Sequence, residues 1–363
     1  MRKLYGLAVV ILVVMASLSA PSHALTPKQH SEIARLALEK HIRPGYALLA
    51  SVTSELEETM QFFCAKPSTI GRADVDRQFE KTLMAWSKIE HIRFGPVSME
   101  DRINRFIFWP DHKSIGLRQV KKALRTQKND VLDQAKLRQK SVALQGLTAL
   151  EYLLFGTDGE KIGESSSEAR FRCAYAMAIS KNLALISTGI VEDWRDGKEF
   201  VEIYLHPRQD SDIYQTPKEV TLALFLSFTT ELKIIQLLKL GRPVGKTEKK
   251  ARPRRAAFWR SKLEYKVVDA NMAGVLALFD RVFSEAVSES DPGVEESVLL
   301  DFEQNHRDLL AIKLPIGEAV YDGSERAKLK NLLITIEQIK NDAGTAIIKS
   351  ADLSMGFNAL DGD

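Results

Sequence analysis

The stretch Ser165–Trp194, SSSEARFRCAYAMAISKNLALISTGIVEDW, decides the fold class. Its apolar residues return at three- and four-residue spacings, which is the pattern of one face of an α-helix and not the alternation of a strand. Serines open the stretch, and Glu168 follows Ser165 by three residues, as in a capping box at a helix N-terminus. We therefore expect a long helix that begins at Ser165 and ends near Trp194.

The same helical periodicity runs outward from this stretch through most of the chain, whereas strand signals are scarce. The helical pattern lapses between residues 195 and 216, and the Pro- and Gly-containing segment 241–255 indicates a linker or surface loop. Four long helices on each side of the 195–216 gap predict an all-α fold with two four-helix bundles in tandem, residues 25–200 and 201–363. The expected helices span 26–64 with a kink at Pro44–Gly45, 74–92, a short 102–109, 129–155, 165–194, 217–240, 262–286, 294–312 and 325–349.

Residues 1–24 have the features of an export signal. Arg2 and Lys3 precede the apolar run Leu7–Met15, and Ser22–Ala24 is a small-x-small exit. The alternative is an uncleaved anchor, but the run is shorter than the roughly 20 residues that a spanning helix needs. We expect cleavage near Ala24, a periplasmic location, and a mature chain without a transmembrane segment.

Net charge argues against a polyanionic partner. Residues 1–24 carry two positive and no negative charges, so their removal lowers the formal net charge from +3 to +1. Such a balance predicts no binding to nucleic acid.

The chain has two cysteines, Cys64 and Cys173, both in the part expected to be exported. An oxidising compartment favours a disulfide, although two separate buried thiols are the alternative. Cys64 closes the first expected helix and Cys173 lies about two turns into the fourth. In an up-down bundle both fall at the same end, so the geometry permits the bond.

Glu151 is the only charged residue in the run Val142–Phe155, VALQGLTALEYLLF. A carboxylate in apolar surroundings is costly unless it is paired, hydrogen-bonded or bound to a metal. Three interpretations stay open: an ion pair with Arg93 or Arg102, contact with a ligand or metal, or simple exposure.

The phrase Gly146–Gly156, GLTALEYLLFG, resembles the signature of the imelysin family, which is implicated in iron handling. In that signature Gly-x-His-x-x-Glu precedes a Leu-Leu-aromatic-Gly ending. Further phrases that carry the resemblance are Ala85–Trp86, Arg93–Pro96, Phe108–Asp111, Trp259–Ser261 and Gly356–Ala359. They extend the resemblance over nearly the whole mature chain.

The resemblance implies a metal site, for iron or another divalent or trivalent metal, and a peptidase activity. Here Thr148 stands where the signature has histidine, three residues before Glu151 on one helical face. A hydroxyl is a poor substitute for imidazole toward a transition metal. The metal site therefore carries over only at Glu151, with His91 and His112 as further candidate ligands, and we expect no catalysis.

Other polar and aromatic residues near these phrases suit an anionic or aromatic ligand, although packing between helices is the alternative role. They are Trp86, Arg93, Arg102, Trp109 and Asp111. Segment 242–255, with seven lysines and arginines against one glutamate, fits a solvated loop better than a contact for anionic lipid or an acidic protein.

These patterns predict a periplasmic, imelysin-like binding protein that takes part in iron acquisition without catalysis. Its partner would be a metal, a metal complex or another envelope protein. An imelysin-type metallopeptidase and an envelope scaffold are the alternatives.

Overall fold

The computed structural model describes residues 25–353, and its regular elements within that range are all helical. The predicted all-α fold class is confirmed. The expected export signal, residues 1–24, lies outside the described part of the chain. Residues 354–363, which include the Gly356–Ala359 phrase, lie outside it as well.

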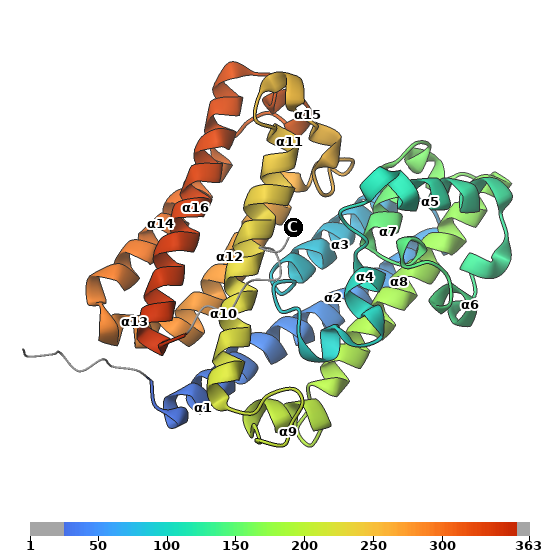
Figure 1. Cartoon of the computed structure of the whole chain (residues 1–363). Coiled ribbons are helices and arrows are strands. Elements are labelled where there is room, and N and C mark those ends of the chain that lie inside the picture. The colour runs from blue at the N-terminus through green and yellow to red at the C-terminus, as the bar shows by residue number, and fades with distance from the viewer. Residues whose placement is uncertain (1–24, 354–363) are drawn as a thin grey trace, which may run out of the picture.

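The helices form two groups, one on each side of the molecule in Figure 1. In the first group, α2 (Arg43–Ala65) lies against both α3 (Thr69–Ser87) and α8 (Ser167–Asp193). α8 is the helix predicted from Ser165 to Trp194, with its cap one residue later, because the Ser166 side chain accepts a hydrogen bond from Ala169 N.

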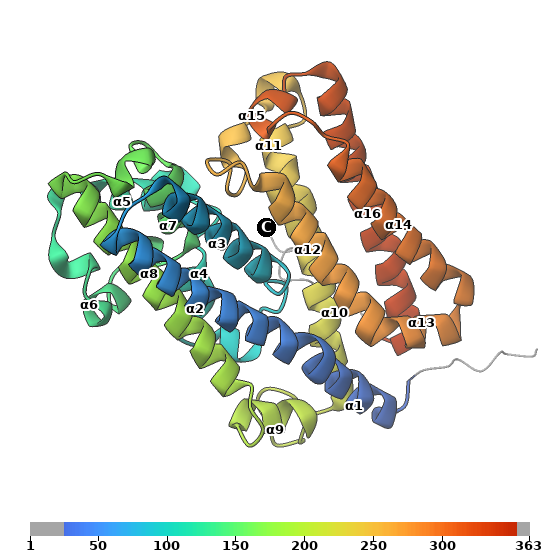
Figure 2. The same cartoon turned by 180° about the vertical axis from the view of Figure 1, so that it is seen from behind.

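The second group is built around α10, α12, α14 and α16, and Figure 2 shows its long helices from behind. α14 and α10 both lie against α16. The elements are α10 (Pro217–Lys233), the π-helical turn Ile234–Gly241, α11 (Arg242–Val244), α12 (Glu264–Leu278), the π-helical turn Phe279–Phe283, α13 (Ser284–Ser290), α14 (Pro292–Leu310), α15 (Ile316–Ala319) and α16 (Gly323–Ala351).

The first helix does not stay within one group. α1 (Pro27–Leu36) packs against α10 of the second group, and α3 packs against α12. At the second contact a Cβ on Gly274 would lie 2.2 Å from the carbonyl oxygen of Lys88, so only glycine permits this approach. The division near residue 200 into two tandem bundles stays a prediction.

The predicted kink at Pro44–Gly45 corresponds to a π-helical turn, Ala37–Ile42, that joins α1 to α2. Proline has no N–H, so Pro44 cannot donate to the carbonyl of Lys40 one turn earlier. Arg281 supplies the missing donor, because its Nη1 lies 2.9 Å from Lys40 O. A side chain from the second group thus satisfies a backbone acceptor of the first.

The expected long helix 129–155 is wrong, because the chain breaks before α7 (Leu147–Phe155). Gly146 is extended, with φ −120° and ψ −169°, and a Cβ there would lie 2.3 Å from Phe106 O. The close approach of the preceding segment excludes a continuous helix. The shorter helices before α7 are α4 (Arg102–Phe106), α5 (Ile115–Thr126) and α6 (Gln134–Arg138).

The expected gap 195–216 also contains a helix, α9 (Glu199–Leu205). It forms because Phe200, Val201 and Tyr204 share one face and are buried. Phe200 and Tyr204 lie among the aromatic rings of Trp194 and Tyr214. α9 is too short for its periodicity to be recognised in the sequence, and aromatic packing stabilises it.

Two described helices, Ser167–Asp193 and Pro217–Val244, are long and apolar enough to cross a membrane by length and composition. In each helix, 61% of the most apolar stretch of 18 residues is buried inside the protein. Both fit core helices of a folded protein, in which an all-round apolar surface is covered by neighbours.

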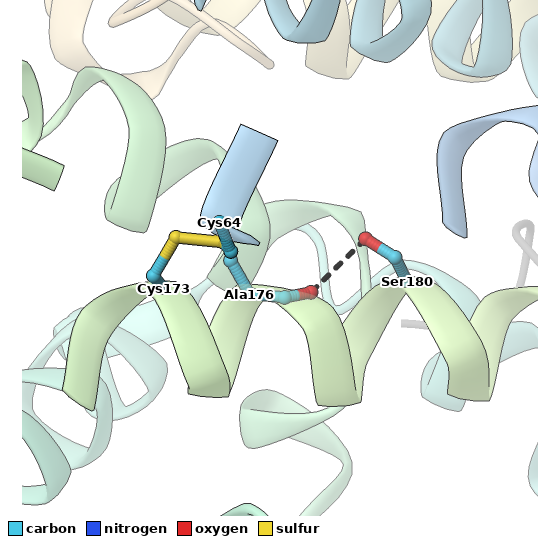
Figure 3. The surroundings of a disulfide bond; sticks show 4 residues. All are labelled: Cys64, Cys173, Ala176 and Ser180. Atoms are coloured by element: carbon cyan, nitrogen blue, oxygen red, sulfur yellow. Dashed lines mark hydrogen bonds between the residues drawn. A yellow bond between two sulfur atoms is a disulfide. The ribbon is translucent and has the colours of Figure 1, made fainter. Parts of the chain in front are cut away.

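The predicted disulfide between Cys64 and Cys173 is present, with the two Cα atoms 5.8 Å apart. Figure 3 shows it joining the end of α2 to α8, beside Ala176 and Ser180. The bond closes a loop across a sequence separation of 109 residues and fixes one end of the α2–α8 pair.

Replacing both cysteines with serine is expected to lower the free energy of unfolding by about 2–4 kcal/mol, because the unfolded chain regains the entropy of the open loop. Urea unfolding of the oxidised wild type and of the double variant measures the difference. Added reductant should destabilise the wild type and leave the variant unchanged. Equal stabilities of the two proteins would contradict the prediction.

Candidate functional site

Glu151 is buried in α7, with 3% of its surface exposed, and its carboxylate is held by a turn from the second helix group. Its Oε1 accepts hydrogen bonds from Arg260 N at 3.0 Å, from Ser261 N at 3.1 Å and from Ser261 Oγ at 3.1 Å. The Arg260 guanidinium lies 3.6 Å from Oε2. Burial raises the pKa of Glu151, and Arg260 and the donors from Ser261 oppose this shift.

The turn that holds Glu151 is bounded by two residues in the left-handed region, Phe258 and Lys262, each with φ +58°. Such conformations are unfavourable for residues with a Cβ and persist where the surroundings impose them. Here they direct two successive backbone N–H groups at one carboxylate oxygen, as in an anion-binding nest. Glu151 fills that nest and ties the turn to α7.

α7 presents one face to a cleft. Along the helix, Leu147 and the residues from Ala149 to Leu154 are buried, and Thr148 is partly exposed. Thr148 and Glu151, three residues apart, both line the cleft. The signature spacing thus places its two polar positions on the same wall, as the helical period requires.

The cleft has a volume of about 910 Å³ and lies between the two helix groups. One wall comes from the segment Phe108–Asp111 with α5 and α7, and the other from residues 251–264 with residues 315–317 and Tyr321. Figure 1 shows the chain after α11 extending toward α5 and α7. Two of the residues predicted as ligand contacts, Trp109 and Asp111, line this cleft together with Glu151.

Cations and aromatic rings alternate where the second wall meets α7. The Arg260 guanidinium carbon lies 4.6 Å from the ring centre of Trp259 and 5.6 Å from that of Tyr152. The guanidinium carbon of Arg254 lies near the same Trp259 ring, 5.7 Å from its centre. Stacking of this kind holds guanidinium groups in place while leaving their edges free to donate.

The basic segment 242–255 is not only a solvated loop, because Ala251–Arg255 lines the cleft. Arg326 of α16 donates to Val244 O at 2.7 Å and to Gly245 O at 2.9 Å. Arg252 N donates to Pro243 O at 2.8 Å, which folds the segment back on itself. Charge patterning alone indicated the cations but not the surface that they face.

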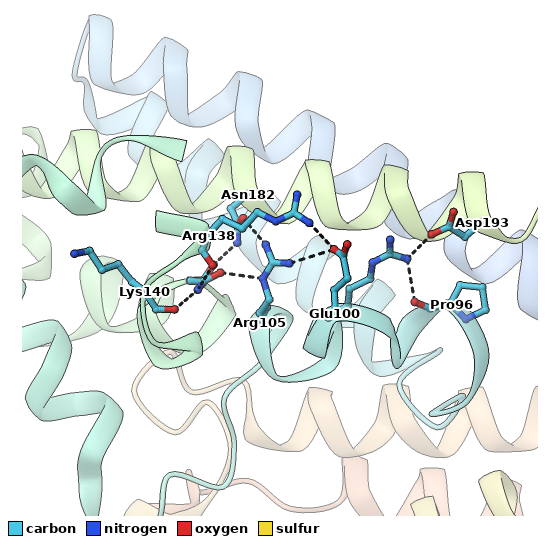
Figure 4. Close-up of polar contacts among 9 residues, drawn as sticks. Pro96, Glu100, Arg105, Arg138, Lys140, Asn182 and Asp193 are labelled. Carbon is cyan, nitrogen blue, oxygen red and sulfur yellow. Dashed lines mark hydrogen bonds and ion pairs between the residues drawn. The ribbon is translucent and has the colours of Figure 1, made fainter. Parts of the chain in front are cut away.

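Three of the predicted ligand residues lie elsewhere. Trp86 is buried and stacks on Phe106, with ring centres 4.3 Å apart, so it belongs to the core. Arg102 pairs with Asp193 at 2.7 Å and donates to Pro96 O at 2.9 Å, in the network of Figure 4. Arg93 is exposed, and it does not line the cleft. The partner of Glu151 is therefore neither Arg93 nor Arg102.

The tentative metal ligands do not meet. His91 is buried against His41, with their Nε2 atoms 2.7 Å apart, and His112 is exposed in a short turn before α5. Neither lines the cleft. Within residues 25–353, no three His, Cys, Asp or Glu side chains are grouped to hold a metal ion.

Beside His91 lies a buried polar cluster that the sequence did not indicate. Lys239, in the π-helical turn 234–241, contacts Glu90, lies 3.4 Å from Glu231 Oε1 and donates to Asn271 Oδ1 at 2.6 Å. Asn271 in turn donates to Glu90 Oε1 at 2.6 Å. Burial raises the pKa of Glu231 to about 7, against the attraction of Lys239. The cluster connects the turn after α3, in the first group, to α10 and α12 of the second.

The fold and the site define an all-helical protein in which two helix groups enclose a cleft beside a buried carboxylate. A sequence model of the imelysin family matches residues 42–342. The chain therefore belongs to the imelysin family.

Two solved structures share this fold. An imelysin-like protein from Psychrobacter arcticum 273-4 superposes with a TM-score of 0.76 at 17% identity, covering 92% of this chain and 98% of that one. A protein provisionally described as an iron-regulated protein A precursor, from Parabacteroides distasonis ATCC 8503, gives a TM-score of 0.72 at 12% identity, with 89% and 96% covered. No curated protein matches the sequence.

Replacing Glu151 tests its role in holding the turn. Glu151→Ala leaves the N–H groups of Arg260 and Ser261 without their acceptor, so we expect a loss of about 1–3 kcal/mol in the free energy of unfolding. Glu151→Gln keeps an acceptor oxygen and should lose less than Glu151→Ala. Urea unfolding of both variants measures the order, and equal losses would contradict the proposed hydrogen bonding.

A third prediction concerns pH and the histidine pair. Burial lowers the pKa of His41 to about 4, and it also lowers the pKa of His91. The unfolded chain takes up protons below its ordinary histidine pKa while the folded pair stays neutral. The contribution of the pair to the free energy of unfolding is therefore complete above about pH 6.5 and is lost as the pH falls toward 4. For His41 alone the loss is about 2 kcal/mol at pH 5.

The measurement compares wild type with the double variant His41→Gln/His91→Gln, because Glu231 shifts the stability of both proteins in the opposite sense. With its raised pKa the folded protein gains a proton near neutral pH before the unfolded chain does. Only the difference between the two stability curves reports the histidines. Curves that stay parallel from about pH 7.5 to about pH 5 would contradict the prediction.

Proposed function

We propose that this imelysin-family protein is a periplasmic, non-catalytic binding protein that holds a metal or a metal complex in the cleft beside Glu151 and takes part in iron acquisition. The observation that carries the proposal is the state of the Glu151 carboxylate. Its Oε1 already accepts three hydrogen bonds, and the side chain three residues before it is Thr148 and not histidine. The cleft therefore offers binding surface without the donor set of a metallopeptidase.

Metal-dependent hydrolysis needs a metal held by about three protein ligands, with an open position for water. The residues of the cleft do not fit such a resident metal. Thr148 contributes a hydroxyl, and Asp111 accepts hydrogen bonds from the N–H groups of Gly116 and Leu117. The imelysin-type metallopeptidase alternative is correspondingly weakened.

Two further observations support the location and the link to iron. The Cys64–Cys173 disulfide suits an oxidising compartment, as does the export signal expected in residues 1–24. The structural relative described as iron-regulated and as a precursor supports iron acquisition and export by analogy. The envelope-scaffold alternative relied on the basic segment as a contact, and part of that segment lines the cleft.

Mature protein purified from the periplasm of iron-replete cells is expected to carry iron and to hydrolyse no peptide substrate in a chelator-sensitive way. Elemental analysis and a casein assay with and without chelator measure both. Proteolysis that chelator abolishes and that disappears in Glu151→Gln would overturn the proposal. Iron content no higher than in a periplasmic control protein would overturn it as well.

Thr148→His separates a missing ligand from a missing site. The substitution places an imidazole on the cleft face one turn from Glu151, where the family signature has it. Because Oε1 of Glu151 is already occupied, we expect little gain in affinity for divalent transition metals. A strong gain together with new hydrolysis would show that one residue alone separates this chain from a metallopeptidase.

A further inference from the structure

The carboxylates that line the cleft are engaged by backbone N–H groups. Asp111 accepts from Gly116 N and Leu117 N, and Glu151 accepts from the 260–261 turn. Glu264 Oε1 accepts from Ile316 N at 2.9 Å, and burial raises the pKa of this third acid. Glu264 Oε2 is buried and accepts no hydrogen bond, but one acid oxygen falls short of a ligand set. For its other ligands a bare cation entering the cleft would have to compete with these donors.

Some cations on the wall formed by residues 251–264 are, by contrast, not engaged by acids. Arg254 and Arg255 line the cleft, are exposed, and form no salt bridge among the described residues. Two other cations of this wall do have an acid nearby, because Lys262 is attracted by Glu264 and Arg260 lies beside Glu151. Exposed guanidinium groups without an acid are the usual recognition elements for carboxylate or phosphate oxygens.

The backbone under these cations is fixed before any ligand arrives. Arg326 and the Arg252–Pro243 hydrogen bond hold the segment from both sides. The Trp259 ring lies beneath Arg254 and Arg260, and Trp109 is on the opposite wall. Such preorganisation lowers the entropy lost on binding and favours a compact ligand with flat faces.

We propose that the cleft takes iron as a small anionic carboxylate chelate, with Arg254 and Arg255 binding the chelate's oxygens, and not as a bare cation. This inference rests on the proposed function, because it names the form in which the metal is bound. The cleft volume of about 910 Å³ accommodates a chelate of a few carboxylate groups. The metal keeps the chelator's oxygens as its ligands, so the protein needs no vacant carboxylate.

Ferric citrate is the probe, with gallium citrate as its redox-inert equivalent, citrate alone as the metal-free control and Mn²⁺ as the bare cation. Binding to the mature chain is measured by calorimetry and by tryptophan fluorescence. We expect binding of both metal citrates that weakens as salt is added, because the attraction is between charges. Arg254→Gln and Arg255→Gln should each weaken it roughly tenfold or more.

Arg242→Gln is the matched control, because Arg242 belongs to the same basic segment, is exposed and does not line the cleft. It should leave ferric citrate binding unchanged. An equal effect of Arg242→Gln would mean that bulk charge and not the cleft attracts the chelate, and this would overturn the inference. All three side chains are exposed, so the variants are expected to have the melting temperature of the wild type.

The remaining outcomes separate this inference from the proposed function. Tight binding of Mn²⁺ or ferrous ion that Arg254→Gln and Arg255→Gln leave unchanged would overturn the chelate and keep a metal-binding protein. Equal affinity for citrate alone would also overturn it, since the metal would then contribute nothing. Absence of binding to every probe would remove both the inference and the binding function on which it rests.

Discussion

The cleft depends on one interaction, the acceptance of the Arg260 and Ser261 N–H groups by the buried Glu151 carboxylate. A carboxylate without these donors would be too costly to keep ionised among the leucines of α7. The turn 258–262, with its two left-handed residues, would lack the contact that offsets their conformational strain. Each component stabilises the other, so the carboxylate and the turn form a single unit.

The position of this unit determines the chemistry of the cleft. α7 belongs to the first helix group and the turn to the second, so the interaction closes one end of the space between them. It also turns Trp259 and Arg260 toward that space. The positions of Arg260 and of the Trp259 ring beneath Arg254 therefore depend on an acid whose Oε1 already accepts three hydrogen bonds.

Two further polar contacts join the groups, and each involves a side chain of a π-helical turn. The turns 37–42, 234–241 and 279–283 contain His41, Lys239 and Arg281. A π-helical turn adds a residue to the helical repeat and so shifts which side chains face inward. Lys239 thereby reaches Glu90, and Arg281 reaches the Lys40 carbonyl that Pro44 leaves without a donor.

Sequence periodicity predicted the elements that are long and locally determined, such as α8. The expected oxidising compartment together with helix order predicted the Cys64–Cys173 pair. It failed for 129–155, where the reason for the break is the backbone of Phe106 pressing on Gly146, a contact between residues far apart in the chain. Glu151 was recognisable as a buried acid, but its partners are 109 and 110 residues away. The phrase Trp259–Ser261 was visible as a family feature, yet no local pattern connects it with Glu151.

The replacement of the signature histidine by Thr148 fits the structural role of Glu151 in holding the turn 258–262. A metal held by residues 148 and 151 would have to take Oε1 from three hydrogen-bond donors or Oε2 from the neighbouring guanidinium of Arg260. Either exchange would release the turn that shapes the cleft. With threonine at 148 the conflict does not arise, because the Glu151 carboxyl keeps its hydrogen bonds to the turn. This arrangement supports the proposal that the cleft binds a metal that arrives with its own ligands.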